Sequence, residues 1–123
     1  MTKKGYYFLE LDKASSSRLK KMAKHEVVYC HHVTLCFMPN EAQHQYYQNL
    51  LGEIFPFRAT KYRYSNKVDC VTVELPCDSK EFPHVTLSCA DGVKPVEAND
   101  LINATSKDIR LSLNGIVKFF EFK

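Results

Sequence analysis

The sequence lacks several features that would assign it to a class at once. No apolar run approaches the roughly 18 residues that span a membrane, and residues 1–12 lack the apolar stretch of a signal peptide. There is no linker or low-complexity segment, and 45% hydrophobic and 25% charged residues are ordinary for a globular protein. We therefore expect one domain over residues 1–123, without membrane attachment.

Charge of one sign is also scarce. The formal net charge of +3 is compatible with an anionic substrate but is too small to indicate general nucleic-acid binding. Closely spaced cysteine pairs of the CxxC type are absent. The five cysteines, an odd number, are Cys30, Cys36, Cys70, Cys77 and Cys89. We expect a cytoplasmic, reducing environment in which they behave mostly as small core residues.

Strand and helix patterns alternate along the chain. Strands are predicted over residues 5–11, 27–37, 55–64, 68–75, 82–89 and 108–122, and helices over residues 14–24, 41–51 and, briefly, 99–104. Asn114-Gly115 marks either a hairpin turn or a bulge within the last strand. Strands that meet through short turns favour an α+β fold with a mainly antiparallel sheet over a doubly wound parallel sheet.

One tetrapeptide, His-Val-Thr-Leu, occurs twice, and its histidines His32 and His84 are 52 positions apart. Residues two apart in a strand share a face, so each histidine shares a face with the threonine that follows it, Thr34 or Thr86. The valine and leucine of each copy take the other face. The two copies therefore place equivalent residues on equivalent faces of their strands.

Neighbouring residues of the first copy divide by the same alternation. Cys30 and Cys36 are predicted on the side of His32, whereas His31 is predicted on the opposite, apolar side and in a structural role. A metal site of His32 and His84 with Cys30 or Cys36 matches no standard ligand spacing.

Two imidazoles can divide the work of cleaving a phosphodiester. A neutral imidazole accepts a proton from the attacking water, and a protonated one donates a proton to the leaving oxygen. Threonine hydroxyls can donate hydrogen bonds to the non-bridging phosphate oxygens. This chemistry requires no metal or other cofactor. The alternative is a module that binds a nucleotide or RNA phosphate without turnover.

Paired H-x-[S/T]-x motifs in strands, each followed by an apolar residue, resemble the 2H phosphoesterase superfamily of LigT-like phosphodiesterases. The resemblance implies a bilobal, pseudo-two-fold α+β fold, in which mainly antiparallel sheets line a central cleft and helices lie outside. It also implies metal-independent hydrolysis, with His32 and His84 as the acid–base pair and Thr34 and Thr86 as phosphate-binding hydroxyls. The tract from Gly92 to Val96 is similar to a loop in the tRNA-ligase-associated branches.

The same resemblance implies a substrate with a phosphodiester at a ribose 2′ position. Candidates are RNA 2′,3′-cyclic ends, 2′–5′ oligoadenylates and cyclic dinucleotides with a 2′–5′ linkage. Small members of this type, some encoded by viruses or phages, act on nucleotide second messengers of host immune signalling. We expect a monomer without an obligate protein partner.

Further substrate contacts are expected from aromatic and basic side chains. Arg58 lies in a stretch of cations and aromatics that either holds a phosphate and stacks a base or belongs to an exposed edge strand. Tyr7, or its neighbours in residues 6–8, and Phe82 are candidates for stacking on a nucleobase or for the core. Lys94 either closes over the substrate or is exposed. The cations of the first predicted helix form a solvated face or a patch for a phosphate backbone.

Overall fold

A computed structural model describes residues 3–77 and 82–122 of the chain. The strands are β1 (Gly5–Leu11), β2 (Val27–Val28), β3 (His32–Phe37), β4 (Ile54–Tyr64), β5 (Val68–Glu74), β6 (His84–Cys89) and β7 (Ser106–Glu121). The helices are α1 (Lys13–Lys20), α2 (Glu41–Gln48) and the 3-10 helix η1 (Pro95–Asn103).

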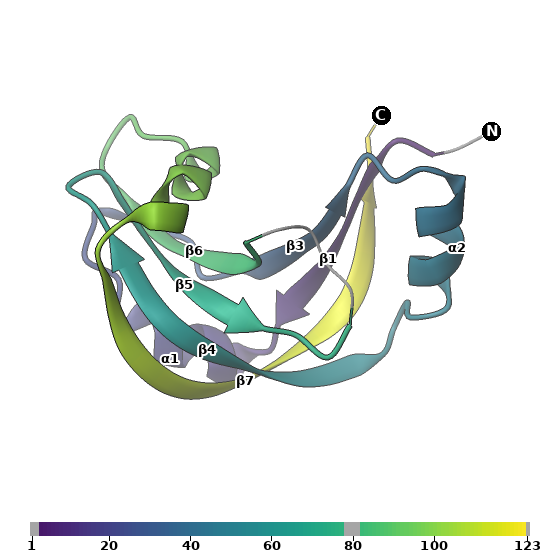
Figure 1. Cartoon of the computed structure of the whole chain (residues 1–123), viewed down its shortest axis with the longest axis horizontal. Helices are drawn as coiled ribbons and strands as arrows, with labels where there is room; N and C mark the ends of the chain where they lie inside the picture. The colour runs from purple at the N-terminus through teal and green to yellow at the C-terminus, as the bar shows by residue number, and fades with distance from the viewer. Residues whose placement is uncertain (1–2, 78–81, 123) are drawn as a thin grey trace.

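Six strands form one antiparallel sheet that closes on itself. Their order is β6-β3-β1-β7-β4-β5, and β5 pairs back onto β6, while β2 adds a short extra strand at β6. In Figure 1 β7 is a long, bent strand, with η1 above one end of the sheet and α2 beside the other. No helix in the described part of the chain is both long and apolar enough to cross a membrane.

The predicted bilobal α+β fold with helices on the outside is wrong. The chain forms a closed six-stranded barrel with one extra strand, and helix accounts for only 22%. β6 closes it, because Val85 pairs with Val33 of β3 on one side and with Val71 of β5 on the other. The two histidine motifs therefore lie on adjacent strands of one sheet. The alternation of apolar residues shows where strands lie but not which strands pair. It therefore could not show that the two lobes implied by the family resemblance are absent.

The interior of the barrel is apolar because alternate residues of its strands point inward. Fully buried side chains come from five strands: Leu9, Val33, Leu35, Val71, Val85, Leu87, Leu113 and Val117. Burying a side chain of this size contributes about 1.5–3 kcal/mol. The valine and leucine of both tetrapeptides belong to this core, as their parity predicts.

Local signals account for several element boundaries. Asn40 and Gln43 form a reciprocal capping box at the start of α2, which confirms that helix start. Residues 106–121 form one strand, not a hairpin, and Gly115 pairs with both Leu11 and Phe55. A Cβ at Gly115 would lie 3.2 Å from a backbone oxygen of β1, so a close strand approach explains this glycine.

Candidate active site

The two tetrapeptides meet in register across the β3–β6 pair. Val33 lies opposite Val85, and both side chains are fully buried in the core. In two antiparallel strands, the residues before and after two opposed residues point to the opposite face of the sheet from those two. This places His32 across from Thr86, and Thr34 across from His84, on the face outside the barrel.

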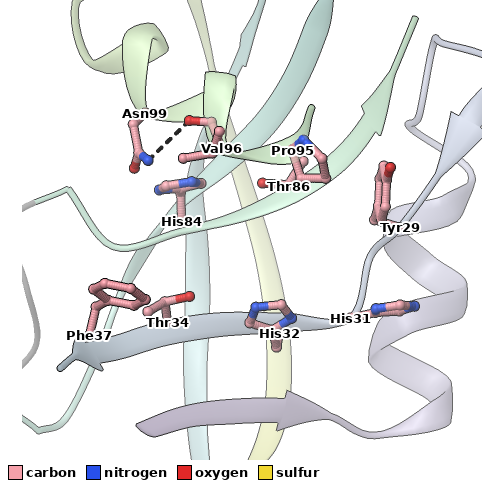
Figure 2. A pocket seen from close by; sticks show the side chains of 10 residues that line it. All are labelled: Tyr29, His31, His32, Thr34, Phe37, His84, Thr86, Pro95, Val96 and Asn99. Atoms are coloured by element: carbon pink, nitrogen blue, oxygen red, sulfur yellow. Dashed lines mark hydrogen bonds between the residues drawn. The ribbon is translucent and has the colours of Figure 1, made fainter. Parts of the chain in front are cut away.

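These four side chains line one pocket of about 610 Å³. The other residues that line it are Tyr29, His31, Phe37, Pro95, Val96 and Asn99. Figure 2 shows β3 and β6 running across the pocket, with Val96 and Asn99 of η1 beside His84. We call this site the histidine pocket. It combines the imidazoles and hydroxyls of both tetrapeptides with a wall supplied by η1.

A bulge before β3 shapes one side of the histidine pocket. Val28 pairs with Ser88 and Val33 with Val85, so four residues, 29–32, lie opposite only two, 86–87. Cys30 absorbs this excess with a left-handed backbone (φ 57°), a conformation that few non-glycine residues adopt. The predicted unbroken alternation over residues 27–37 is therefore wrong.

The bulge changes which side chains face the pocket. Cys30 turns into the core, where its thiol lies 3.5 Å from the Leu87 carbonyl oxygen. Cys36 is also buried in the core, so neither cysteine is on the side of His32. His31, predicted on the opposite face, instead lines the pocket with its ring stacked near that of His32. A second irregularity, between Tyr7 and Phe8 of β1, lets exposed Phe37 line the pocket too.

His84 is held by the residue two positions before it. Its Nδ1 lies 2.9 Å from the Phe82 carbonyl oxygen, which can only accept a hydrogen bond, so Nδ1 carries a proton. The Phe82 ring stacks on the imidazole, with centroids 4.7 Å apart. Phe82 has a left-handed backbone (φ 58°), and such strain in a non-glycine residue is typical of functional sites. This arrangement fixes the ring of His84 and its tautomer.

Arg63 of β4 lies over the Phe82 ring that stacks on His84. Its guanidinium lies 5.7 Å from the centre of the Phe82 ring, on which His84 stacks. Two hydrogen bonds hold it there, to Thr72 Oγ1 at 3.0 Å and to the Ala104 carbonyl oxygen at 3.2 Å. Thr72 is in turn the strand partner of His84. Arg63 therefore supports Phe82 and, through it, His84.

His32 has a more open setting than His84. The ring of Phe8 meets its ring edge-on at 5.4 Å, and Tyr6 lies 6.1 Å away. Both aromatics come from β1, the strand next to β3. His84 is only 8% exposed, whereas His32 is partly exposed. The two imidazoles thus differ in their surroundings although their sequence contexts match.

Three of the predicted substrate contacts lie away from the histidine pocket. Tyr7 is buried in the core, where its hydroxyl bonds His44 Nδ1 at 2.9 Å and burial raises its pKa. Arg58 is exposed on β4 and lies 4.0 Å from Glu74. Lys94 is exposed just before η1. The structure brings together His32, Thr34, His84 and Thr86, and it places Phe82 behind His84.

The residues that sequence reasoning missed come mainly from η1. Asn99 donates a hydrogen bond to the Val96 carbonyl oxygen at 3.0 Å, and both residues line the pocket beside His84. The tract from Gly92 to Val96 was the one signal pointing to this region. Pro95 and Val96 of that tract line the pocket, whereas Lys94 does not.

Comparison with known proteins adds no family assignment. No protein-family model matches the chain, and no curated protein matches its sequence. Within residues 3–77 and 82–122, no three His, Cys, Asp or Glu side chains cluster so that they could hold a metal ion. The functional assignment must therefore come from the geometry of the histidine pocket and from the motifs that build it.

Proposed function

We propose that this protein is a metal-independent phosphodiesterase of the 2H type. Its substrate is a 2′-linked or 2′,3′-cyclic phosphodiester of RNA or of an oligonucleotide second messenger. The observation that carries the proposal is the register of Val33 with Val85, which gives one pocket both imidazoles and both threonine hydroxyls. The 2′ position in the substrate comes from the resemblance of both motifs to the 2H phosphoesterases.

The chemistry assigns one proton transfer to each imidazole. One accepts a proton as the oxygen of water attacks phosphorus, and the other donates a proton to the ribose oxygen as its bond to phosphorus breaks. Thr34 and Thr86 donate hydrogen bonds to the non-bridging oxygens, where negative charge grows in the transition state. For His84 the reacting atom is Nε2, because Nδ1 already donates to the Phe82 carbonyl oxygen.

The charge of the pocket favours a diester over a monoester. Its described lining residues include no lysine or arginine, so among them only a protonated histidine carries positive charge. A phosphodiester carries one negative charge, which one imidazolium balances. A phosphomonoester carries close to two at neutral pH and would be less well compensated there.

The cysteines support a reducing compartment for this activity. All five are free thiols, and four of them, Cys30, Cys36, Cys70 and Cys89, are buried. Buried thiols without a disulfide are typical of proteins in the cytoplasm. We infer that the enzyme acts there as a monomer, without an obligate protein partner.

A substrate panel tests the proposal. Purified protein is incubated in EDTA with an RNA 2′,3′-cyclic end, a 2′–5′ oligoadenylate and a 2′–5′-linked cyclic dinucleotide, and products are separated by chromatography. We expect turnover of at least one substrate by the wild type and none by His32→Ala or His84→Ala. Binding of the panel without any product would identify a phosphate-binding module, and turnover that EDTA abolishes would identify a metal enzyme.

A further inference from the structure

A second hollow, of about 600 Å³, adjoins the histidine pocket. It lies between β1 and α1, and it shares His31 and His32 with the histidine pocket. We call it the basic hollow. A ligand held at the histidines therefore lies next to the basic hollow, with the His31 and His32 side chains lining both spaces. The proposed hydrolysis of one phosphodiester does not by itself account for this extension.

Aromatic rings form the wall of the basic hollow next to His32. Tyr6 and Phe8 of β1 line it, with ring centroids 5.4 Å apart, and Phe8 reaches the His32 ring. The ring of Phe120, on β7, lies 5.5 Å from Tyr6 and is 52% exposed. These side chains share the outer face of the sheet with His32. Phe8 and Tyr6 offer flat apolar rings whose centres lie 5.4 Å and 6.1 Å from that of the His32 imidazole.

Cations lie on the other side of the basic hollow. Lys13 and Lys20 of α1 line it, as does the carboxylate of Glu10. Glu10 is 2.7 Å from the ammonium of Lys118, so its charge is already paired. The unbalanced charge of the hollow is therefore positive. These two lysines belong to the cations for which the sequence left a solvated face and a phosphate-binding patch as alternatives.

Rings on one side and cations on the other match the chemistry of single-stranded nucleic acid. Bases stack on aromatic side chains whatever their sequence, while lysines follow the phosphates. A purely apolar partner would leave the ammonium groups unpaired, and a free phosphate would leave the rings exposed. A nucleotide uses both.

We infer that the basic hollow binds the nucleotide adjacent to the scissile phosphate, so the substrate is a chain of two or more nucleotides rather than a mononucleotide. This inference rests on the proposed phosphodiesterase function of the histidine pocket. The base of the adjacent nucleotide stacks on Tyr6 and Phe8, and its phosphate lies near Lys13 and Lys20. Cyclic mononucleotides fill the histidine pocket alone.

Two substrates with the same reacting end test the inference. One is adenosine 2′,3′-cyclic phosphate, and the other is an RNA trinucleotide that ends in the same cyclic phosphate. We expect the wild type to favour the trinucleotide in kcat/KM by about 5- to 100-fold, the range set by stacking one base. Equal kcat/KM for the two would overturn the inference while leaving the phosphodiesterase proposal intact.

Variants localise the preference to the basic hollow. Phe8→Leu keeps an apolar side chain but removes the ring, and Lys13→Ala/Lys20→Ala removes the cations. Each should reduce the ratio of the two kcat/KM values by at least about fivefold. Lys67→Ala/Lys107→Ala, which removes two exposed lysines outside both sites, should keep the wild-type ratio. A ratio unchanged by Phe8→Leu and by the Lys13/Lys20 variant would overturn the assignment.

A binding measurement separates this inference from the proposed enzyme activity. Fluorescence anisotropy follows a labelled RNA trinucleotide with a 3′-phosphate, with adenosine 3′-monophosphate as a competitor. If no substrate of the panel is hydrolysed, tighter trinucleotide binding that Phe8→Leu weakens supports the basic hollow and refutes the enzyme. Equal binding of both ligands overturns the inference. Light scattering is a further check. A wild-type dimer that the substitution Phe8→Leu dissociates would also overturn the inference, because a second copy of the chain would then cover the rings.

Discussion

Val33 of β3 lies directly opposite Val85 of β6, and both are fully buried. This one pair relates the two tetrapeptides by an approximate local two-fold, since each histidine lies across from the threonine of the other copy. The valines anchor the strands in the core. The outer face then presents two imidazoles and two hydroxyls to one pocket.

The threonine hydroxyls should stabilise the transition state more than they stabilise the bound substrate. Thr34→Val or Thr86→Val keeps the shape of the side chain but removes the hydrogen-bond donor. We expect kcat to fall by about 100-fold or more, the effect of removing one donor to a developing oxyanion. Steady-state kinetics measure this, and Thr→Ser at the same positions should retain most activity. A rise in KM with kcat unchanged would instead mean that the hydroxyls bind the ground state and the transition state equally well.

The tautomer of His84 can be observed directly. Its Nδ1 donates to the Phe82 carbonyl oxygen, so the neutral imidazole should carry its proton on Nδ1 and its lone pair on Nε2. Long-range ¹H–¹⁵N correlation spectra of the protein at alkaline pH report which ring nitrogen is protonated. We expect the Nδ1–H form to dominate for His84. A dominant Nε2–H form would contradict the role assigned to Phe82.

Buried Asp69 should stabilise the region that carries β6. Its carboxylate accepts hydrogen bonds from the Tyr62 hydroxyl at 2.6 Å, the Ser88 hydroxyl at 2.5 Å and the Lys24 backbone N–H at 3.1 Å. Asp69→Ala leaves these donors buried without their acceptor, so we expect a loss of about 3 kcal/mol in the free energy of unfolding. Urea denaturation measures it, with Asp108→Ala as a control because that carboxylate is exposed. Equal effects of the two substitutions would contradict this role.

Stability should fall as the pH rises above about 9. Burial raises the pKa of the Cys30 thiol to about 11 and that of Cys70 to about 12, whereas the ordinary value is 9.0. Between these values the unfolded chain has released protons that the folded chain still binds, so rising pH favours unfolding. Each thiol contributes a loss of up to about 1.4 kcal/mol for each pH unit in this window.

Urea midpoints at about pH 8 and pH 10 check this prediction over the lower part of the window. The variant Cys30→Ala/Cys70→Ala should be less stable at both pH values, because it loses core packing. Its difference between the two pH values should nevertheless be smaller than that of the wild type. A difference of the same size in both proteins would assign the pH dependence to other groups.

The alternation of strand faces in the sequence predicted which side chains of the two tetrapeptides face the pocket. It failed where the backbone departs from a regular strand. His32 with Thr34 and His84 with Thr86 lie as the alternation requires, because each copy keeps its valine and leucine in the core. His31 does not, because Cys30 takes up a bulge that no glycine marks in the sequence.

The fold was harder to infer than the motifs. Alternation identifies a strand and its buried face, but the pairing of β6 with β3 joins segments that are distant in sequence. The η1 wall of the pocket carries no periodic pattern either. Its contacts depend on how the loop after β6 folds back over the sheet, and Asn99 is placed by that path.

The most direct measurement of the central claim is kcat in EDTA for four proteins: the wild type, His32→Ala, His84→Ala and the double variant. Two imidazoles that act in one reaction predict a loss of at least about 100-fold in each single variant and little further loss in the double variant. His25→Ala is the matched control, because its ring lies outside the pocket and contacts the Ser65 carbonyl oxygen. Either single variant within a few-fold of the wild-type rate would contradict the two-histidine mechanism.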